Sequence, residues 1–102
     1  MKYRIVLHGM VQGVGCRWLV KRVAKNMKLS GIVRNRSDGS VEIYVDAFGD
    51  KIIDKFIDEI QKSTQGTAVQ IMKVGRFTED DNEFFSSRPP KVYPDFEIDA
   101  TY

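Results

Sequence analysis

The spacing of the apolar residues changes at a glycine-rich segment near the N-terminus, Gly9–Gly15. Before this segment, residues 3–8 alternate with the two-residue period of a β-strand. After it, the apolar residues of 16–27 recur at intervals of three and four, so that they form one stripe on a helix. The sequence therefore predicts a strand, a tight loop and a helix in direct succession.

The same two periods recur along the rest of the chain. Strand patterns cover residues 31–36, 41–47, 69–77 and 96–102, and a second helical pattern covers residues 52–60. We expect Asp50 to cap this helix and Gly66 to follow its end. The turn Ser37–Ser40 contains an Asp-Gly pair, which supplies the positive φ of a tight hairpin. Residues 78–91 have no regular pattern and no role that we can assign.

This order of elements predicts an α+β fold. A βαββαβ order with a hairpin between the two helices is typical of the ferredoxin-like sandwich, in which both helices pack on one face of a mostly antiparallel sheet. The 102 residues suit one domain, and we see neither an internal boundary nor a repeat. We therefore expect a single domain over residues 1–102.

Composition narrows the classes of partner and compartment. The net charge is only +2, from 16 basic and 14 acidic residues, so nothing indicates nucleic acid or a membrane surface as a partner. No apolar run approaches the roughly 20 residues of a membrane span. The single cysteine, Cys16, excludes an internal disulfide, and we expect a monomer in a reducing cytoplasm.

The glycine-rich loop is the segment with the clearest chemical meaning. Glycines allow successive backbone N–H groups to turn inward around an anion, and the following helix N-terminus adds unpaired donors. Arg17 lies in the first helical turn, where a cation opposes the helix dipole unless an anion lies between them. A guanidinium can then bind two phosphate oxygens. From the residues alone, a simple tight turn with a solvated Arg17 remains an equal alternative.

Two sequence blocks carry a resemblance to a known family. The segment Val11-Gln12-Gly13-Val14-Gly15-Cys16-Arg17 is similar to the acylphosphatase signature V-Q-G-V-x-F-R. The segment 31–42 resembles the same family's G-x-V-x-N-x-x-D-G-x-V-E. The blocks occur in the family's order and spacing, and the likeness is close over residues 3–48. The family fold is the same ferredoxin-like sandwich.

The resemblance implies hydrolysis of acyl phosphates to a carboxylate and inorganic phosphate, without metal or other cofactor. It implies that Arg17 binds the phosphoryl group together with loop amides, and that Asn35 positions the attacking water. The phosphate-binding residues would then be Gln12, Gly13, Val14, Gly15, Cys16 and Arg17.

Two residues depart from the family pattern. Cys16 stands where the family usually has phenylalanine, so the floor of the loop is expected to be looser and the rate uncertain. Lys28 stands where the family often has glycine. If Lys28 adopts left-handed geometry, the cost is about 1 kcal/mol.

Two other functions stay open at this point. Cys16 and Arg22 satisfy the C-x5-R spacing of cysteine-dependent phosphatases, although the residues between them are helical and contain no glycine. The fold also serves binding modules, including RNA-binding domains. The basic helix residues Lys21, Arg22, Lys25 and Lys28 would suit such a role, but a merely solvated face is the simpler reading.

For two further residues near the loop we expect no direct part in the chemistry. His8 is the only histidine, and it has no neighbouring ligands in the sequence that would form a metal site with it. Trp18 follows Arg17, and we expect it to pack against the core, with the mouth of the substrate site as the alternative.

Overall fold

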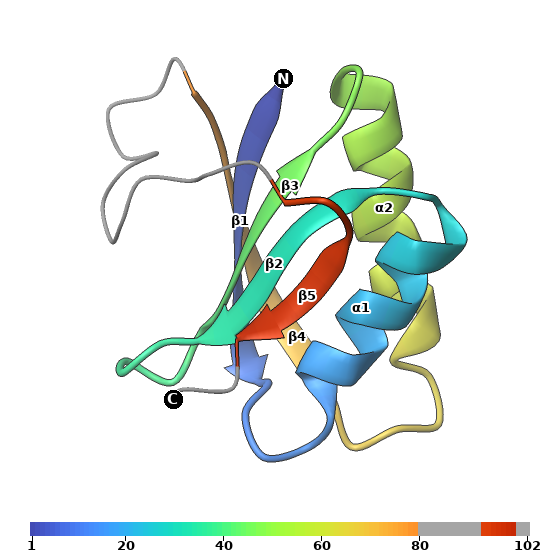
Figure 1. Cartoon of the computed structure of the whole chain (residues 1–102). Helices are drawn as coiled ribbons and strands as arrows, with labels where there is room; N and C mark the ends of the chain where they lie inside the picture. Colours follow the sequence, from blue (N-terminus) through green and yellow to red (C-terminus); the bar gives the residue numbers. More distant parts are fainter. Residues whose placement is uncertain (80–92, 100–102) are drawn as a thin grey trace.

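The computed structural model describes residues 1–79 and 93–99. Its elements follow the expected order (Figure 1): β1 (Lys2–Met10), α1 (Cys16–Asn26), β2 (Ser30–Asn35), β3 (Val41–Asp46), α2 (Asp50–Ser63), β4 (Gln70–Thr78) and β5 (Phe96–Asp99). The last strand pattern extends to residue 102, and its positions 100–102 lie outside the described residues, as do 80–91 of the irregular segment.

The five strands form one mixed sheet in the order β4-β1-β3-β2-β5. β1 pairs antiparallel with both β3 and β4, and β2 pairs antiparallel with β3. Only β2 and β5 run parallel. Both helices lie on the same side of the sheet (Figure 1). The predicted α+β sandwich, mostly antiparallel with two helices on one face, is confirmed.

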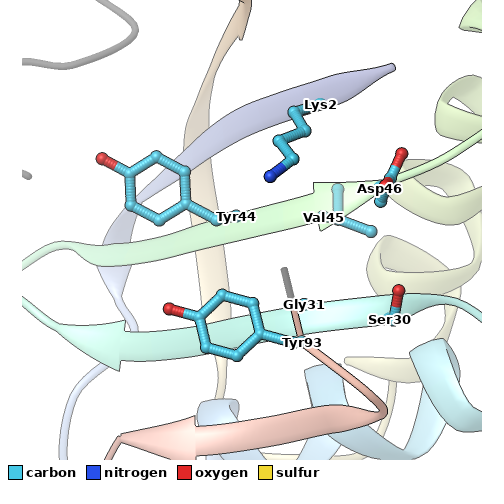
Figure 2. Close-up of a pocket in the computed structure, with 7 residues that line it drawn as sticks. All are labelled: Lys2, Ser30, Gly31, Tyr44, Val45, Asp46 and Tyr93. Carbon is cyan, nitrogen blue, oxygen red and sulfur yellow. The ribbon is translucent and has the colours of Figure 1, made fainter. Parts of the chain in front are cut away.

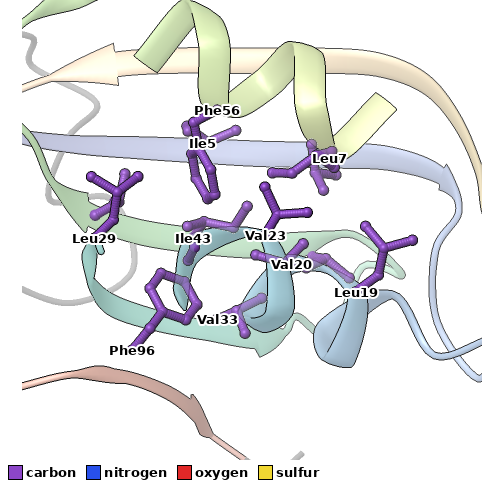
Figure 3. Packing of buried hydrophobic residues seen from close by; sticks show 14 of the residues in the cluster. Ile5, Leu7, Leu19, Val20, Val23, Leu29, Val33, Ile43, Phe56 and Phe96 are labelled. Carbon is purple, nitrogen blue, oxygen red and sulfur yellow. The ribbon is translucent and has the colours of Figure 1, made fainter. Parts of the chain in front are cut away.

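The core lies between the sheet and the helices. Ile5, Leu7, Val33 and Ile43 project from the strands toward Val20 and Phe56 of the helices, as Figure 3 shows. The strand alternation and the helix stripes supply these side chains, because each period turns one set of apolar residues to the same side. Burial of this apolar surface fixes the two helices over β1, β3 and β2.

The open face of the sheet is less exposed than the alternation alone predicts. The strand alternation of residues 41–47 places Glu42 on the face away from the helices, yet it is 0% exposed. Its carboxylate accepts hydrogen bonds from Arg4 Nε of β1 (2.7 Å) and from Arg34 Nε of β2 (2.8 Å). Two guanidinium groups on the neighbouring strands therefore satisfy the charge of Glu42 and permit its burial.

The start and the end of α2 differ from the prediction. Gly49 is the N-cap and makes no side-chain cap bond, so the expected cap role of Asp50 is wrong. Asp50 is instead the first residue of the helix, and its carboxylate accepts a hydrogen bond from the Tyr3 hydroxyl (2.9 Å). The helix ends at Ser63, and Gly66 lies in the turn that follows with φ 77°. The Asp50 carboxylate thus pairs with Tyr3 of β1 and with Arg76 of β4 (3.3 Å).

Candidate active site

The predicted phosphate loop connects β1 to α1. β1 continues through Met10 because Gly9 and Met10 still pair with β4, so the loop is shorter than the glycine pattern indicates. Gly13 and Gly15 have φ values of 74° and 84°, whereas Val14 between them does not have a positive φ. Such an alternation of left-handed and ordinary backbone directs successive N–H groups to one side and forms an anion-binding concavity.

The N–H groups of this loop are not used by the secondary structure. Among the described residues, the first backbone N–H after Met10 that donates to a backbone carbonyl is that of Leu19, which binds the Gly15 carbonyl (3.1 Å). The first turn of α1 contains no acidic side chain to occupy the free donors. The loop and the helix N-terminus therefore offer a set of main-chain donors and a partial positive charge to an anion.

The Arg17 side chain turns toward the C-terminal strand. Arg17 is half-buried, and its Nη1 donates a hydrogen bond to the Asp99 carbonyl of β5 (3.2 Å). Asp99 is in register with Arg34 on the parallel strand β2. Since Asn35 follows Arg34, this contact brings the Arg17 guanidinium to the end of β2 at which Asn35 lies.

Asn35 is the last residue of β2. Successive strand side chains alternate between faces, so Asn35 shares the helix-covered face with Val33, a member of the core. Asn35 is only 8% exposed, and its Oδ1 has no hydrogen-bond partner among the described residues. A buried acceptor without a protein partner is costly and rare, so Asn35 Oδ1 is suited to accept a hydrogen bond from a bound molecule.

Gln12 holds the loop against the β2–β3 hairpin. Its side-chain Nε2 donates to the Arg36 carbonyl (2.7 Å) and to the Ser40 carbonyl (2.8 Å). We had expected Gln12 to contribute only its backbone amide. The anchoring role of the side chain could not be read from the sequence, because the two acceptors are backbone groups 24 and 28 residues further along the chain. The Gln12 anchor reaches Arg36, which follows Asn35 in the chain. The Arg17–Asp99 bond lies beside Arg34, which precedes Asn35.

Cys16 belongs to the core and not to a reactive site. Its side chain is 1% exposed, and burial raises the pKa of the thiol to about 11. The thiol is therefore neutral near pH 7 and cannot act as a thiolate nucleophile. Arg22 is exposed six positions further along α1. The alternative of a cysteine-dependent phosphatase through Cys16 and Arg22 is wrong, because helix α1 occupies the segment that would have to wrap the anion.

Trp18 does not pack into the core as expected. It is 68% exposed, and the Lys21 ammonium lies 5.4 Å from the centroid of its ring. In the helical register, Leu19 and Val20 are buried and Trp18 lies on the outer side of the first turn. The helical period places position 18 about opposite the buried stripe of Cys16, Leu19 and Val20, so the expectation of core packing also conflicts with the sequence pattern itself.

Basic side chains on α1 and just after its end are exposed to solvent. Lys25 and Lys28 are exposed, and Lys25 forms an ion pair with Asp95 (2.9 Å). Lys28, which stands where the family often has glycine, has left-handed backbone geometry with φ 58°. These observations fit a solvated helix face.

Other parts of the described structure offer less to a ligand. Within residues 1–79 and 93–99, no three His, Cys, Asp or Glu side chains come together in a way that could hold a metal ion. Neither helix described is long and apolar enough to cross a membrane. Figure 2 shows Tyr44 and Tyr93 beside a depression on the sheet. The two tyrosines also pack with Ile32. The depression has a volume of about 20 Å³, which is little more than a water molecule needs, and none of the predicted site residues lines it.

The fold and the loop together define a class of protein. It is a ferredoxin-like α+β domain with a main-chain loop suited to an anion at the start of its first helix. A cation, Arg17, follows that loop and bonds to β5, and a buried amide, Asn35, ends the neighbouring strand β2.

Comparison with known proteins gives the family. The acylphosphatase family model matches residues 3–98. The chain is 37% identical over 97 residues to an acylphosphatase of Ligilactobacillus salivarius, and the match covers 94% of each chain. It is 42% identical over 74 residues to an acylphosphatase of Bacillus licheniformis, covering 72% of this chain and 81% of that one. A crystal structure of acylphosphatase from Bacillus subtilis has a TM-score of 0.73 at 28% identity and covers 96% of this chain and 97% of its own.

The chain belongs to the acylphosphatase family. This membership supports its activity as a hydrolase of acyl phosphates, which are small-molecule substrates. The two sequence blocks therefore predicted the family and the fold correctly.

Proposed function

We propose that the backbone amides of Gln12–Cys16 and the Arg17 guanidinium hold the phosphoryl group, and that Asn35 Oδ1 orients the water that attacks it. The observation that carries this proposal is the buried Asn35 Oδ1, which has no partner among the described residues. A carboxamide oxygen is an acceptor only, so it suits the O–H of a water molecule. The Arg17–Asp99 contact keeps the guanidinium at the same end of the sheet.

Electrostatics favours an anion in this position. Arg17 extends toward β5, no acidic side chain lies in the first turn of α1, and the loop N–H groups donate to no backbone carbonyl of the described residues. Donors that are already oriented stabilise charge without reorganisation during the reaction. Phosphoryl transfer depends mainly on such positioning and charge stabilisation.

Hydrolysis of an acyl phosphate needs no general acid for the leaving group. The water oxygen forms a bond to phosphorus, the bond from phosphorus to the acyl oxygen breaks, and its electron pair leaves with the carboxylate. A carboxylate has a pKa of about 4 and departs without protonation. Asn35 does not titrate and cannot be a general base, so the proton of the water passes to a phosphate oxygen. The products are a carboxylate and inorganic phosphate.

We further propose that residues 1–102 act as one domain and as a monomer in the cytoplasm, with neither nucleic acid nor membrane as a partner. The core that joins both helices to the sheet supports one folding unit. The unpaired thiol of Cys16 fits a reducing compartment. The near-neutral net charge of +2 argues against a polyanion as the natural partner.

Hydrolysis of benzoyl phosphate in the presence of a metal chelator tests the proposal. The wild-type chain should release benzoate and phosphate, with inorganic phosphate as a competitive inhibitor. Arg17→Ala should lose turnover and also inhibition by inorganic phosphate. Turnover by Arg17→Ala at the wild-type rate, or binding of phosphate with no turnover by the wild type, would contradict it; the second result would favour a non-catalytic binding module.

A further inference from the structure

Trp18 is the only tryptophan of the chain, and it is exposed beside the proposed phosphate site. It follows Arg17 directly in α1, and 68% of it is accessible to solvent. A lone exposed apolar residue needs no explanation. Trp18, however, lines a hollow in the surface.

The hollow begins at the phosphate loop. Val14 and Gly15 of the loop line it together with Trp18 and Leu19 of α1 and with Val69, which precedes β4. Its volume is about 350 Å³, which is at the lower end of the range for small-molecule sites. Leu19 and Val69 are buried and provide an apolar floor. Arg22 and Thr67 complete the lining with polar groups.

The position of this hollow matters because of the chemistry of an acyl phosphate. The acyl carbon is separated from phosphorus by a single oxygen atom, so its substituent must leave the phosphate site directly at the rim. Val14 and Gly15 belong both to the proposed phosphate loop and to the lining of the hollow. A substituent that passes over this part of the rim enters an apolar surface instead of bulk water.

The Trp18 ring has a neighbour on its own helix. The Lys21 ammonium lies 5.4 Å from its centroid, within the range of a cation–π contact. At an exposed site such a contact is weak, so it favours this position of the ring without fixing it. Aromatic pairs also contribute more than their buried area alone.

From these observations we propose that the hollow beside Trp18 binds the substituent of the acyl group and selects apolar, above all aromatic, acyl phosphates over acetyl phosphate. This selectivity rests on the proposed function of the loop, Arg17 and Asn35. Trp18 is then a specificity-determining residue, which contacts the substrate without taking part in the chemical step.

Kinetics with two substrates test the selectivity. Trp18→Ala should lower kcat/KM for benzoyl phosphate roughly three- to tenfold and leave kcat/KM for acetyl phosphate within twofold, because only the larger substituent reaches the ring. Trp18→Phe should recover most of the loss. Phe48→Ala is the matched control: Phe48 is also an exposed aromatic residue (99%), but it follows β3 at the opposite end of the sheet from the loop.

The fluorescence of the single tryptophan gives a second readout that does not depend on turnover. Benzoylphosphonate, in which a carbon–phosphorus bond prevents hydrolysis, should change the emission of Trp18 on binding. Acetylphosphonate should bind the loop but change the emission much less. Arg17→Ala should abolish the response to benzoylphosphonate.

The outcomes separate this proposal from the function on which it rests. If the wild type hydrolyses neither substrate, the proposed function fails. If it hydrolyses both, and Trp18→Ala lowers both kcat/KM values equally or neither of them, the phosphate site stands and the role of the hollow is wrong. Equal emission changes with the two phosphonates would also overturn it.

Discussion

The guanidinium of Arg17, at the start of α1, donates a hydrogen bond to the backbone carbonyl of Asp99, in the last strand of the sheet (3.2 Å). Because 82 residues separate the two in sequence, the orientation of the proposed phosphate ligand depends on the pairing of β5 with β2. A planar guanidinium has further N–H groups that can bind phosphate while one is held by this carbonyl.

Arg17→Lys should lower kcat/KM for benzoyl phosphate by about 100-fold or more. The substitution keeps the charge, but an ammonium cannot hold the Asp99 carbonyl and two phosphate oxygens in one plane. The inhibition constant of inorganic phosphate should rise in parallel. Arg76→Lys, in an ion pair with Asp54 on the outer surface, is the control and should leave both values unchanged. Wild-type kinetics in Arg17→Lys would show that charge alone suffices.

Asn35→Ala should lower kcat by roughly 100-fold while the inhibition constant of inorganic phosphate stays within about twofold. The free energy of unfolding, measured with urea, should change by less than about 1 kcal/mol, because the variant removes a buried acceptor that has no partner in the described structure. Loss of phosphate affinity with an unchanged kcat would assign Asn35 to binding instead of to the water.

Gly15→Ala and Gly39→Ala form a matched pair. Both glycines have left-handed φ values, 84° and 92°, and an added Cβ would meet no atom within 4 Å at either position. Each substitution should therefore cost about 1–2 kcal/mol of stability through backbone strain. Only Gly15→Ala should lower kcat/KM, by tenfold or more, because relaxation of its backbone turns the loop amides away from the phosphate. Equal effects on activity would argue against the loop as the binding site.

The stability of the chain should depend on alkaline pH through Cys16. Burial raises the pKa of this thiol from its ordinary 9.0 to about 11, so the folded state holds the proton more tightly than the unfolded chain does. This contribution is fully present below about pH 9 and is lost as the pH rises through about 11. Urea unfolding of the wild type and of Cys16→Ala at pH 8 and pH 10.5 measures it.

The difference in unfolding free energy between the wild type and Cys16→Ala isolates the contribution of the Cys16 thiol. The pKa of Tyr3 is also raised by burial and by its hydrogen bond to Asp50, and that contribution is common to both. The free-energy gap between wild type and variant should narrow at the higher pH, and a constant gap would contradict the assignment. In the same series, Cys16→Ser should retain turnover, as expected when water and not a thiolate attacks phosphorus.

Lys28→Gly should stabilise the protein by up to about 1 kcal/mol without changing its kinetics. Lys28 follows α1 with φ 58°, a conformation that costs an L-residue energy and that glycine adopts freely. Thermal or urea unfolding tests this. Lys55→Gly, at an exposed position inside α2, should destabilise by about 1 kcal/mol and serves as the opposite control. If both variants destabilise, backbone strain at Lys28 is not significant.

Local patterns in the sequence were sufficient for the elements and for the phosphate loop. The two-residue and 3.6-residue periods determine which side of a strand or helix is apolar, and one sheet with two helices buries all of these faces together. The glycines at 13 and 15 take the left-handed conformation that the loop requires, and this follows from backbone sterics at each residue. The left-handed φ of Lys28 was likewise predictable, because the family often has glycine at this position.

Side-chain positions that depend on distant partners could not be derived this way. Asp50 looked like a helix cap, but Tyr3 on β1 takes its carboxylate. Glu42 looked solvent-exposed, but arginines on both neighbouring strands allow it to be buried. Trp18 is a different case, because its position in the helical period lies opposite the buried stripe of α1 and its exposure follows from the local pattern.

The sequence by itself determined the order of the elements, the loop and its family, since these depend on residues close together in the chain. Only the tertiary structure brought Arg17 to Asp99 and the Gln12 side chain to the Arg36 carbonyl, and so enclosed the end of β2 where Asn35 lies. The physical reason is that strand register and helix rotation are set by packing of the whole core, and a hydrogen bond between distant residues forms only after both are established.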